Sequence, residues 1–296
     1  MIAMKTIDVA TIATCGIEPL LADQPVARWL SPGEQAEIGA ARHLQARRQR
    51  LAGRILAKML VQRQLASEPG SAICDPRQIQ IDSRDGMGRR VAPRILVSGR
   101  WLDWSVSISH GESVVAAALS TEGTRPVGID VTDLTGGQQE SLSLWLTEAE
   151  RRIAAEAGPD AAVRLWCLKE AAFKALGEGR RFRPLDWDVS RCAERLSELV
   201  VHGAQSRGTS FDRTADEPGL PCGPAPATRP ATRQFTCAAS VRLRTAQGWL
   251  TRPVDVHTWS CGETLVCLVR TATGSGTADT LDVETPRPQA HELCGC

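Results

Sequence analysis

The sequence predicts an α+β protein, because helical and strand patterns are both frequent in one chain of 296 residues. Apolar residues recur with helical spacing over 31–65 and 147–176. Strand patterns occupy 105–119 and 127–131, where apolar residues alternate with small polar ones or form a short continuous run.

Two α/β halves are expected within this chain. A helix and a hairpin come first, and a helix pair and further strands follow. We place the N-terminal half at 1–123 and the C-terminal half at 124–270. No strong sequence repeat accompanies this division, so any duplication would be structural only.

The N-terminal half is expected to open with one or two strands and a turn within 1–30. Ser31 is a candidate N-cap, Pro32 suits the first helical position, and Glu34 completes a capping box. The helical pattern then continues to about Leu65. It is long for one helix, so we expect a break near Ala46–Arg50.

A hairpin is expected in the second part of this half. Asp82–Gly88 has the composition of a turn, and Arg89–Pro93 is expected to be an irregular basic segment. Ser105–Ser109 alternates as a half-buried strand, and Val114–Leu119 returns after the tight turn at His110–Ser113.

Two helices with clear boundaries are expected in the C-terminal half. Thr147 and Glu150 form a second capping box, and that helix stops at Gly158. Asp160 caps the next helix, which ends at Gly177 as a left-handed residue.

The last third of the chain combines strand patterns with polar segments. Residues 203–233 are rich in Gly, Pro, Ser, Thr and Ala and are expected to form a flexible insert. Gln234–Arg244 and Leu265–Thr271 are expected strands, and 271–296 is expected to be a disordered tail.

The composition is that of an ordinary globular protein, with 42% hydrophobic residues and a net charge of +1. This balance gives no argument for nucleic-acid binding. No apolar run approaches 18 residues and no signal peptide is evident, so we expect no membrane span and a cytoplasmic location. The ten cysteines are dispersed without a C-x-x-C pair and are expected to be free thiols.

The chemistry-bearing residues fall on a helix and a strand. Trp166, Glu170 and Lys174 are spaced by four and share a helix face, and Asp130 follows the apolar run Val127–Ile129 in a short buried strand. Two carboxylates and an ammonium on separate elements are suited to holding Mg²⁺ against a diphosphate. The alternatives are a solvated Glu–Lys pair and a turn or N-cap aspartate.

Several residues are candidates for contacts with an anion. Ser109 and His110 end a strand before a glycine turn, where the histidine is a phosphate donor or simply a hairpin-corner residue bonded to backbone. Arg89 and Arg90 are candidates too, with a solvated pair as the alternative. Arg54 lies on a basic helix that is otherwise a solvated face.

Three motifs in this order resemble the Sfp-type 4′-phosphopantetheinyl transferases. They are Ser107-Ile-Ser109-His110, Val127–Asp130 and Trp166-Cys-Leu-Lys-Glu-Ala-Ala-Phe-Lys174. Ala52-Gly-Arg54 and Gly88–Pro93 are similar to further family segments. The resemblance covers about residues 30–190 and implies the 4′-phosphopantetheinyl transferase fold, with two pseudo-symmetric halves fused in one chain.

The resemblance implies transfer of 4′-phosphopantetheine from coenzyme A to a serine of an apo acyl or peptidyl carrier protein, with release of 3′,5′-ADP. It implies that Asp130 and Glu170 ligate Mg²⁺ and that Lys174 contacts a phosphate oxygen. Glu170, directly or through a metal-bound water, would take the proton of the serine. Residues implied for coenzyme A binding are Arg54, Ser109, His110 and Arg89 or Arg90. Two fused halves would complete one site within a monomer.

One position departs from many family members. Thr132 stands where they carry a third acid, so water or the Thr132 hydroxyl would complete the metal shell. This leaves a non-catalytic module that binds coenzyme A or a carrier protein as the alternative function. An unrelated Mg²⁺-dependent nucleotide hydrolase is a weaker alternative, because no P-loop is present.

Overall fold

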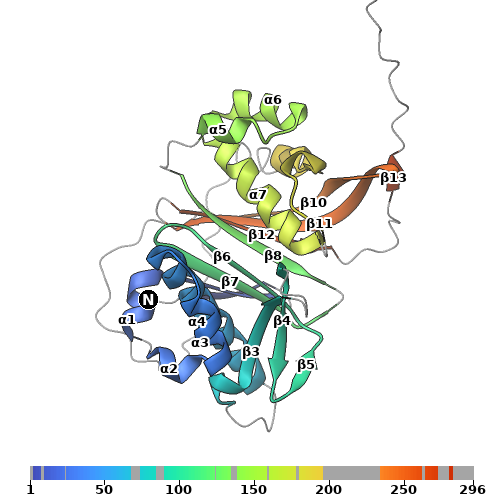
Figure 1. Cartoon of the computed structure of the whole chain (residues 1–296). Helices are drawn as coiled ribbons and strands as arrows, with labels where there is room; N and C mark the ends of the chain where they lie inside the picture. Colours follow the sequence, from blue (N-terminus) through green and yellow to red (C-terminus); the bar gives the residue numbers. More distant parts are fainter. Residues whose placement is uncertain are drawn as a thin grey trace, which may run out of the picture.

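The computed structural model confirms the α+β class, with helices and antiparallel sheets in both parts of the chain (Figure 1). The structure describes residues 3–7, 10–23, 25–67, 74–84, 90–123, 125–134, 139–158, 160–177, 180–195, 234–261, 264–272 and 280–282.

The first part of the chain contains four α-helices, one 3₁₀ helix and seven strands among the residues described. In chain order they are β1 (Ala3–Ile7), β2 (Ala10–Gly16), α1 (Ile17–Asp23), α2 (Val26–Trp29), α3 (Pro32–Gly39), α4 (Leu44–Ala66), η1 (Pro76–Gln78), β3 (Ile79–Arg84), β4 (Arg90–Val97), β5 (Arg100–Leu102), β6 (Ser105–His110) and β7 (Val114–Ser120).

The second part of the chain also has helices between its strands. Its elements are β8 (Val127–Asp133), α5 (Gln139–Ser143), α6 (Glu148–Ala157), α7 (Ala161–Leu176), η2 (Pro184–Asp186), β9 (Trp187–Asp188), β10 (Gln234–Thr245), β11 (Gly248–Cys261), β12 (Thr264–Thr271) and β13 (Thr280–Asp282). A further helical segment covers 190–195.

Three sheets organise these strands. The first has the order β1-β2-β7-β6, and the second has the order β8-β12-β11-β10-β9, with β13 paired to β11. The third, β3-β4-β5, is a small meander beside the N-terminal helices. Every strand pair among them is antiparallel.

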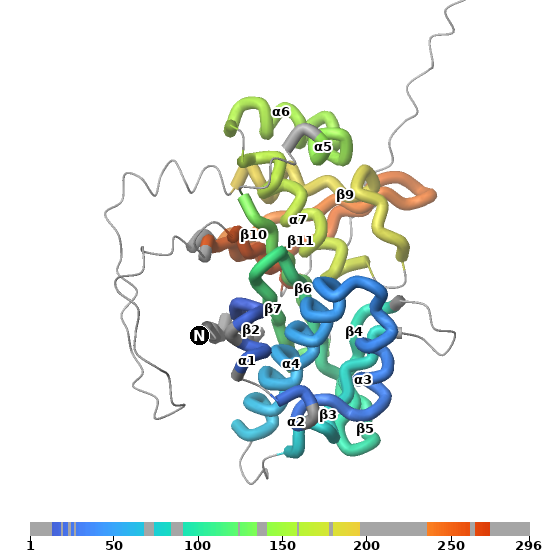
Figure 2. Tube along the Cα trace, turned by 60° about the vertical axis from the view of Figure 1, so that its left-hand side comes forward, coloured from blue at the N-terminus to red at the C-terminus, as the bar shows by residue number. Residues whose placement is uncertain are grey.

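The two larger sheets lie between helices. Helix α4 covers the first sheet and α7 covers the second, and the sheets meet between these two helices (Figures 1 and 2). Separate apolar clusters fill the space under each helix. A third cluster, which includes Ala116 and Ala118 of β7, Ile129 of β8 and Leu268 of β12, joins the sheets. The edge strands β6 and β8 are brought together at this junction.

The structure confirms the elements with the strongest local signals. Ser31 and Thr147 are N-caps, and Glu34 and Glu150 complete their capping boxes. The β6–β7 hairpin, β8, β10 and β12 are present where strands were expected. Among the described residues, no helix is long and apolar enough to span a membrane.

Other expectations were wrong. The helix break lies at 40–43 and not at Ala46–Arg50, because α3 ends at Gly39 and α4 begins at Leu44. Residues 90–93 were expected to be irregular but belong to strand β4, in which Arg90 pairs with Arg84 of β3 and 91–93 lie at a register shift between the two strands. Gly177 has a φ of −86° and is not left-handed.

Some elements had no expected counterpart. Helices α1 and α2 occupy part of 1–30, and the long strand β11 lies between the two strands expected near the C-terminus. Within the expected tail, β13 pairs with β11. The expected insert at 203–233 lies outside the described residues, and the division into two halves stays a prediction.

Candidate functional site

A row of serine side chains joins β6 to β8. Three serines that alternate along β6 accept hydrogen bonds from alternate backbone N–H groups of β8, in place of a backbone ladder. The pairs are Ser105 with Val127 at 3.1 Å, Ser107 with Ile129 at 3.0 Å, and Ser109 with Val131 at 3.3 Å. This serine ladder fixes the register of the two edge strands and places Ser109 beside Asp130.

Asp130 is the centre of the polar cluster at the end of this ladder. Its side chain is buried, with only 3% of the residue surface exposed. Oδ1 accepts hydrogen bonds from Ser109 Oγ and from Lys174 Nζ, both at 2.6 Å. Oδ2 accepts one from Thr132 Oγ1 at 3.1 Å. The carboxylate is therefore held by donors from three elements, which satisfies its charge inside the protein.

Helix α7 carries the other two residues of the cluster. Lys174 Nζ lies 3.0 Å from Ser109 Oγ and 3.6 Å from Glu170 Oε2. The helix reaches this position because Gly128 on β8 lets it approach closely. A Cβ atom at Gly128 would lie 2.0 Å from the carbonyl oxygen of Ala171. Gly128, in the motif Val127–Asp130, thus sets the distance between α7 and Asp130.

The cluster of Asp130, Glu170 and Lys174 contains more negative than positive charge, and the pKa values of Glu170 and Lys174 are shifted. Burial raises the pKa of Glu170, and the negative charge of Asp130 raises it further. Burial opposes the charge of Lys174, but the carboxylates of Asp130 and Glu170 outweigh it and raise the pKa of the ammonium. Two carboxylates facing one ammonium leave excess negative charge, which a divalent cation would neutralise.

The donor set fits Mg²⁺ bound with other ligands. Within the described part of the chain, no three His, Cys, Asp or Glu side chains form a group that could hold a metal alone. Mg²⁺ usually takes one or two carboxylates, several waters and substrate phosphates, so Asp130 and Glu170 suffice. Thr132 contacts Asp130 as a donor, which suits orientation of that carboxylate.

The neighbouring Asp133 has a different role. Its Oδ1 accepts a hydrogen bond from Thr264 at 2.8 Å, and its Oδ2 accepts one from the backbone N–H of Glu112 at 3.2 Å. Asp133 therefore holds the turn that follows His110. No sequence signal had suggested this contact.

His110 ends β6 beside the cluster. Its imidazole reaches solvent, yet partial burial lowers its pKa, and the positive charge of Lys174 lowers it further. The ring is therefore mostly neutral at pH 7 and can offer an N–H group to an anion.

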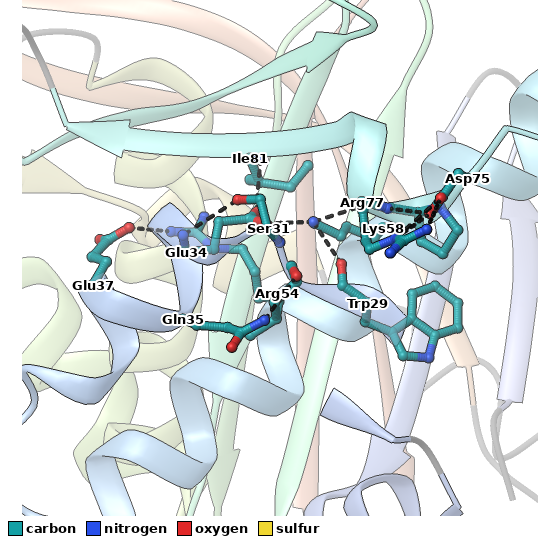
Figure 3. Close-up of polar contacts among 12 residues, drawn as sticks. Trp29, Ser31, Glu34, Gln35, Glu37, Arg54, Lys58, Asp75, Arg77 and Ile81 are labelled. Atoms are coloured by element: carbon teal, nitrogen blue, oxygen red, sulfur yellow. Dashed lines mark hydrogen bonds and ion pairs between the residues drawn. The ribbon is translucent and has the colours of Figure 1, made fainter. Parts of the chain in front are cut away.

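The predicted arginines are not all brought to this cluster. Arg54 is buried, and its Nη2 donates to Glu37 Oε2 at 3.3 Å (Figure 3). The same nitrogen donates to Ser83 Oγ at 3.1 Å. Arg90 lies on β4, but its side chain is outside the described part of the structure, as is the whole of Arg89.

Comparison with known proteins agrees with this site. Residues 126–214 match the family model described as the 4′-phosphopantetheinyl transferase superfamily. The matched segment is less than half of the chain, but it contains Asp130, Glu170 and Lys174 and supports a transferase of this superfamily. No curated protein matches the chain significantly.

Proposed function

We propose that this chain is a Mg²⁺-dependent enzyme that transfers 4′-phosphopantetheine from coenzyme A to a serine of an apo carrier protein. The observation that carries the proposal is the contact among Asp130, Glu170 and Lys174, inside the segment similar to the transferase superfamily. The cluster is negative, buried at one end and open at Glu170, as a cation site facing a substrate requires.

Asp130 and Glu170 are the proposed metal ligands. When bound there, Mg²⁺ would neutralise charge on the diphosphate of coenzyme A. Ser109 and Thr132 hold the Asp130 carboxylate by hydrogen bonds to both of its oxygens. Their role in the proposal is to keep the carboxylate oriented, and Thr132 is a direct ligand only if its hydroxyl turns away from Asp130.

Lys174 and Glu170 are the proposed catalytic groups. The serine oxygen forms a bond to the phosphorus that bears pantetheine, and the bond from that phosphorus to the departing 3′,5′-ADP breaks. The ammonium of Lys174 would move from Asp130 to a phosphate oxygen as charge develops. Glu170 would accept the serine proton, directly or through water, and its raised pKa makes it a better base than an ordinary carboxylate.

Coenzyme A binding is proposed to use residues around the end of β6. His110 would donate a neutral N–H to the 3′-phosphate, and Arg89 or Arg90 would add positive charge. Ser109 reaches a phosphate only by giving up part of its contact with Asp130. Arg54 is paired with Glu37, so its use by coenzyme A requires that pair to open.

The other parts of the proposal concern the partner and the setting. The partner is an apo acyl or peptidyl carrier protein, and the enzyme acts as a monomer in the cytoplasm, without nucleic acid or membrane. A binding module without catalysis is the second candidate. Thr132 favours it, because this residue supplies a hydroxyl where a third carboxylate would strengthen metal binding.

A mass measurement on carrier proteins tests the proposal. The protein is incubated with coenzyme A, Mg²⁺ and a panel of apo carriers from fatty acid, polyketide, peptide and lysine pathways. A gain of one phosphopantetheine that is lost with chelator supports the enzyme. Coenzyme A binding without any gain on the panel favours the module, and Thr132→Glu then tests whether the missing acid is the cause.

A further inference from the structure

A six-residue sequence pattern occurs twice in the chain. Trp-Leu-Ser-Pro-Gly-Glu at Trp29–Glu34 and Trp-Leu-Thr-Glu-Ala-Glu at Trp145–Glu150 share tryptophan, leucine, a hydroxyl residue and glutamate at the same spacing. In both copies the hydroxyl residue caps a helix and the glutamate closes the capping box. This short pattern is therefore repeated in sequence as well as in structure, although any duplication was expected to be structural only.

The glutamate of the first copy also binds a buried lysine (Figure 3). Lys58 Nζ on α4 lies 2.5 Å from Glu34 Oε2, 2.7 Å from the carbonyl oxygen of Trp29 and 3.1 Å from that of Pro76. The other glutamate oxygen accepts the backbone N–H of Ile81 at 3.4 Å. We call these five residues the first cage.

The second copy makes the same contacts with equivalent residues. Lys169 Nζ on α7 lies 2.6 Å from Glu150 Oε2, 3.2 Å from the carbonyl oxygen of Trp145 and 2.8 Å from that of Pro184. Glu150 Oε1 accepts the backbone N–H of Val189 at 2.9 Å. These five residues are the second cage.

In both cages every N–H group of the buried lysine ammonium has an oxygen acceptor. Each ammonium has three N–H groups and three oxygen acceptors, and both lysine side chains are 0% exposed. Burial lowers the pKa of Lys58 and of Lys169 despite the glutamate beside each. Apolar replacements of such buried pairs are often neutral or stabilising, so the pair is a weak device for stability alone. Its distinctive property is that it fixes one geometry.

The two cages differ in what their helices carry. On α7, Lys169 is followed directly by Glu170, and Lys174 comes five residues later. At the equivalent places on α4 stand Met59 and Arg63, which are absent from the site cluster. The chain thus contains one cage on the helix of the site and one matched cage on a helix that lacks these groups.

We infer that Lys169 is a positioning residue for the site, acting through the second cage. This inference rests on the proposed function. Successive residues turn about 100° around a helix, so Lys169 and Glu170 lie on different faces of α7. The cage joins one face to Glu150 of α6 and Pro184 of η2, and Gly128 lets the other face approach β8. Together they fix the rotation of α7 that places Glu170 and Lys174 near Asp130.

Two full-length double variants test the inference. Lys169→Met with Glu150→Gln neutralises the second cage, and Lys58→Met with Glu34→Gln neutralises the first. Methionine keeps an unbranched apolar stem, and glutamine can still close a capping box. For each variant we would measure urea unfolding, Mn²⁺ affinity by electron paramagnetic resonance, kcat and KM for transfer, and the Lys174 Nζ to Asp130 Oδ1 distance in a crystal structure.

We expect the unfolding free energy to change by a similar amount in the two variants, because the two cages make the same contacts. Only the second-cage variant should lose about tenfold or more in Mn²⁺ affinity and in kcat, with a longer Lys174–Asp130 distance. Equal losses in both variants, or an unchanged distance and kcat in the second-cage variant, would overturn the inference.

Failure of the proposed function gives a different result. In that case the wild-type protein modifies no carrier. The crystal distance still decides the inference, because it needs neither metal nor carrier. A Lys174–Asp130 contact kept at 2.6 Å after loss of the second cage overturns it.

Discussion

Ser109 Oγ on β6 donates a 2.6 Å hydrogen bond to Asp130 Oδ1 on β8, and Ser109 Oγ also accepts a hydrogen bond from the backbone N–H of Val131. One hydroxyl therefore joins the edge strands of two sheets and orients the carboxylate at the centre of the candidate site. Ser109 and His110, in the motif Ser107–His110, were predicted to contact phosphate. That contact stays a prediction, and the observed contacts of the motif join the edge strands of the two sheets.

Ser109→Ala should weaken both metal binding and folding. The change removes a donor from a buried carboxylate and the acceptor of the Val131 N–H, which costs about 1–3 kcal/mol of unfolding free energy. Metal affinity should fall about 10–100-fold, as for the loss of other groups that orient ligands. Calorimetric titration with Mg²⁺ and urea unfolding measure the two effects.

Ser105→Ala is the matched control for this variant. It removes a rung of the same ladder, the acceptor of the Val127 N–H, but has no contact with Asp130 among those the structure describes. Its unfolding free energy should fall while Mg²⁺ affinity stays unchanged. Equal losses of affinity in both variants would assign the effect of Ser109 to the ladder alone.

Gly128→Ala should displace α7 from β8. The new methyl group would lie 2.0 Å from Ala171 O and 2.5 Å from Ala175 N, and helix backbone cannot move aside cheaply. Overpacking of this kind costs about 1–3 kcal/mol or more. The loss of transfer should exceed the loss of folded protein at the assay temperature, which circular dichroism and kcat together measure.

Gly53→Ala on helix α4 is the comparison for Gly128→Ala, because Gly53 also lies where a helix approaches a sheet closely. Its methyl group would lie 2.7 Å from Ile108 Cγ2 and 3.6 Å from Val115 Cγ2, so it would meet side-chain methyl groups and not the backbone that a methyl group at Gly128 would meet. We therefore expect a smaller fall in unfolding free energy than for Gly128→Ala. The reverse order would contradict the close approach of α7 as the feature that shapes the site.

Glu170→Gln should stabilise the metal-free protein at pH 7. Burial and Asp130 raise the folded-state pKa of Glu170 above its ordinary value of 4.5, so the charged form is disfavoured in the fold. The wild-type protein therefore loses stability as pH rises from the unfolded-state pKa through the raised folded-state pKa. The loss is about 1.4 kcal/mol for each pH unit that separates these two pKa values. Glutamine removes this cost.

Unfolding measured as a function of pH tests whether the pKa of Glu170 is raised in the folded protein, as this prediction requires. The advantage of Glu170→Gln in chelator should be full above the raised pKa and should vanish below pH 4.5, where both states of the wild type are protonated. Excess Mg²⁺ should reduce or reverse the advantage, because only the wild type keeps both carboxylates. An advantage that grows toward low pH would contradict the raised pKa.

His110→Ala should impair recognition of the 3′-phosphate. Loss of a hydrogen bond to a charged group costs about 1.5–3 kcal/mol, so KM for coenzyme A should rise about tenfold or more. KM for 3′-dephospho-coenzyme A should change little, because that substrate lacks the contacted group. Equal increases for the two substrates would remove His110 from the 3′-phosphate.

Local signals in the sequence were sufficient for much of the fold. The capping boxes at Ser31 and Thr147 and the apolar run before Asp130 each depend on neighbouring residues, and all were found in place. Strand β4 was not expected at 90–93, because it depends on the pairing of Arg90 and of 94–97 with β3, which composition does not reveal. The irregularity expected there is present as a register shift at 91–93.

The site was only partly predictable for the same reason. The spacing of Glu170 and Lys174 places them on one helix face, and that pair lies where it was expected. The Asp130–Lys174 contact joins residues from two elements and depends on the approach of α7 at Gly128. The serine ladder had a visible signal, the alternation of Ser105, Ser107 and Ser109, but its partner strand could not be identified from the sequence.

The most direct test of the proposed metal site is the mass of an apo carrier protein after incubation with coenzyme A, Mg²⁺ and wild-type, Asp130→Ala or Glu170→Ala protein. We predict that the wild type adds one phosphopantetheine and that each variant, folded by circular dichroism, adds none at the same enzyme concentration. Transfer by either folded variant at a rate near that of the wild type would contradict the assignment of this carboxylate pair as the metal site.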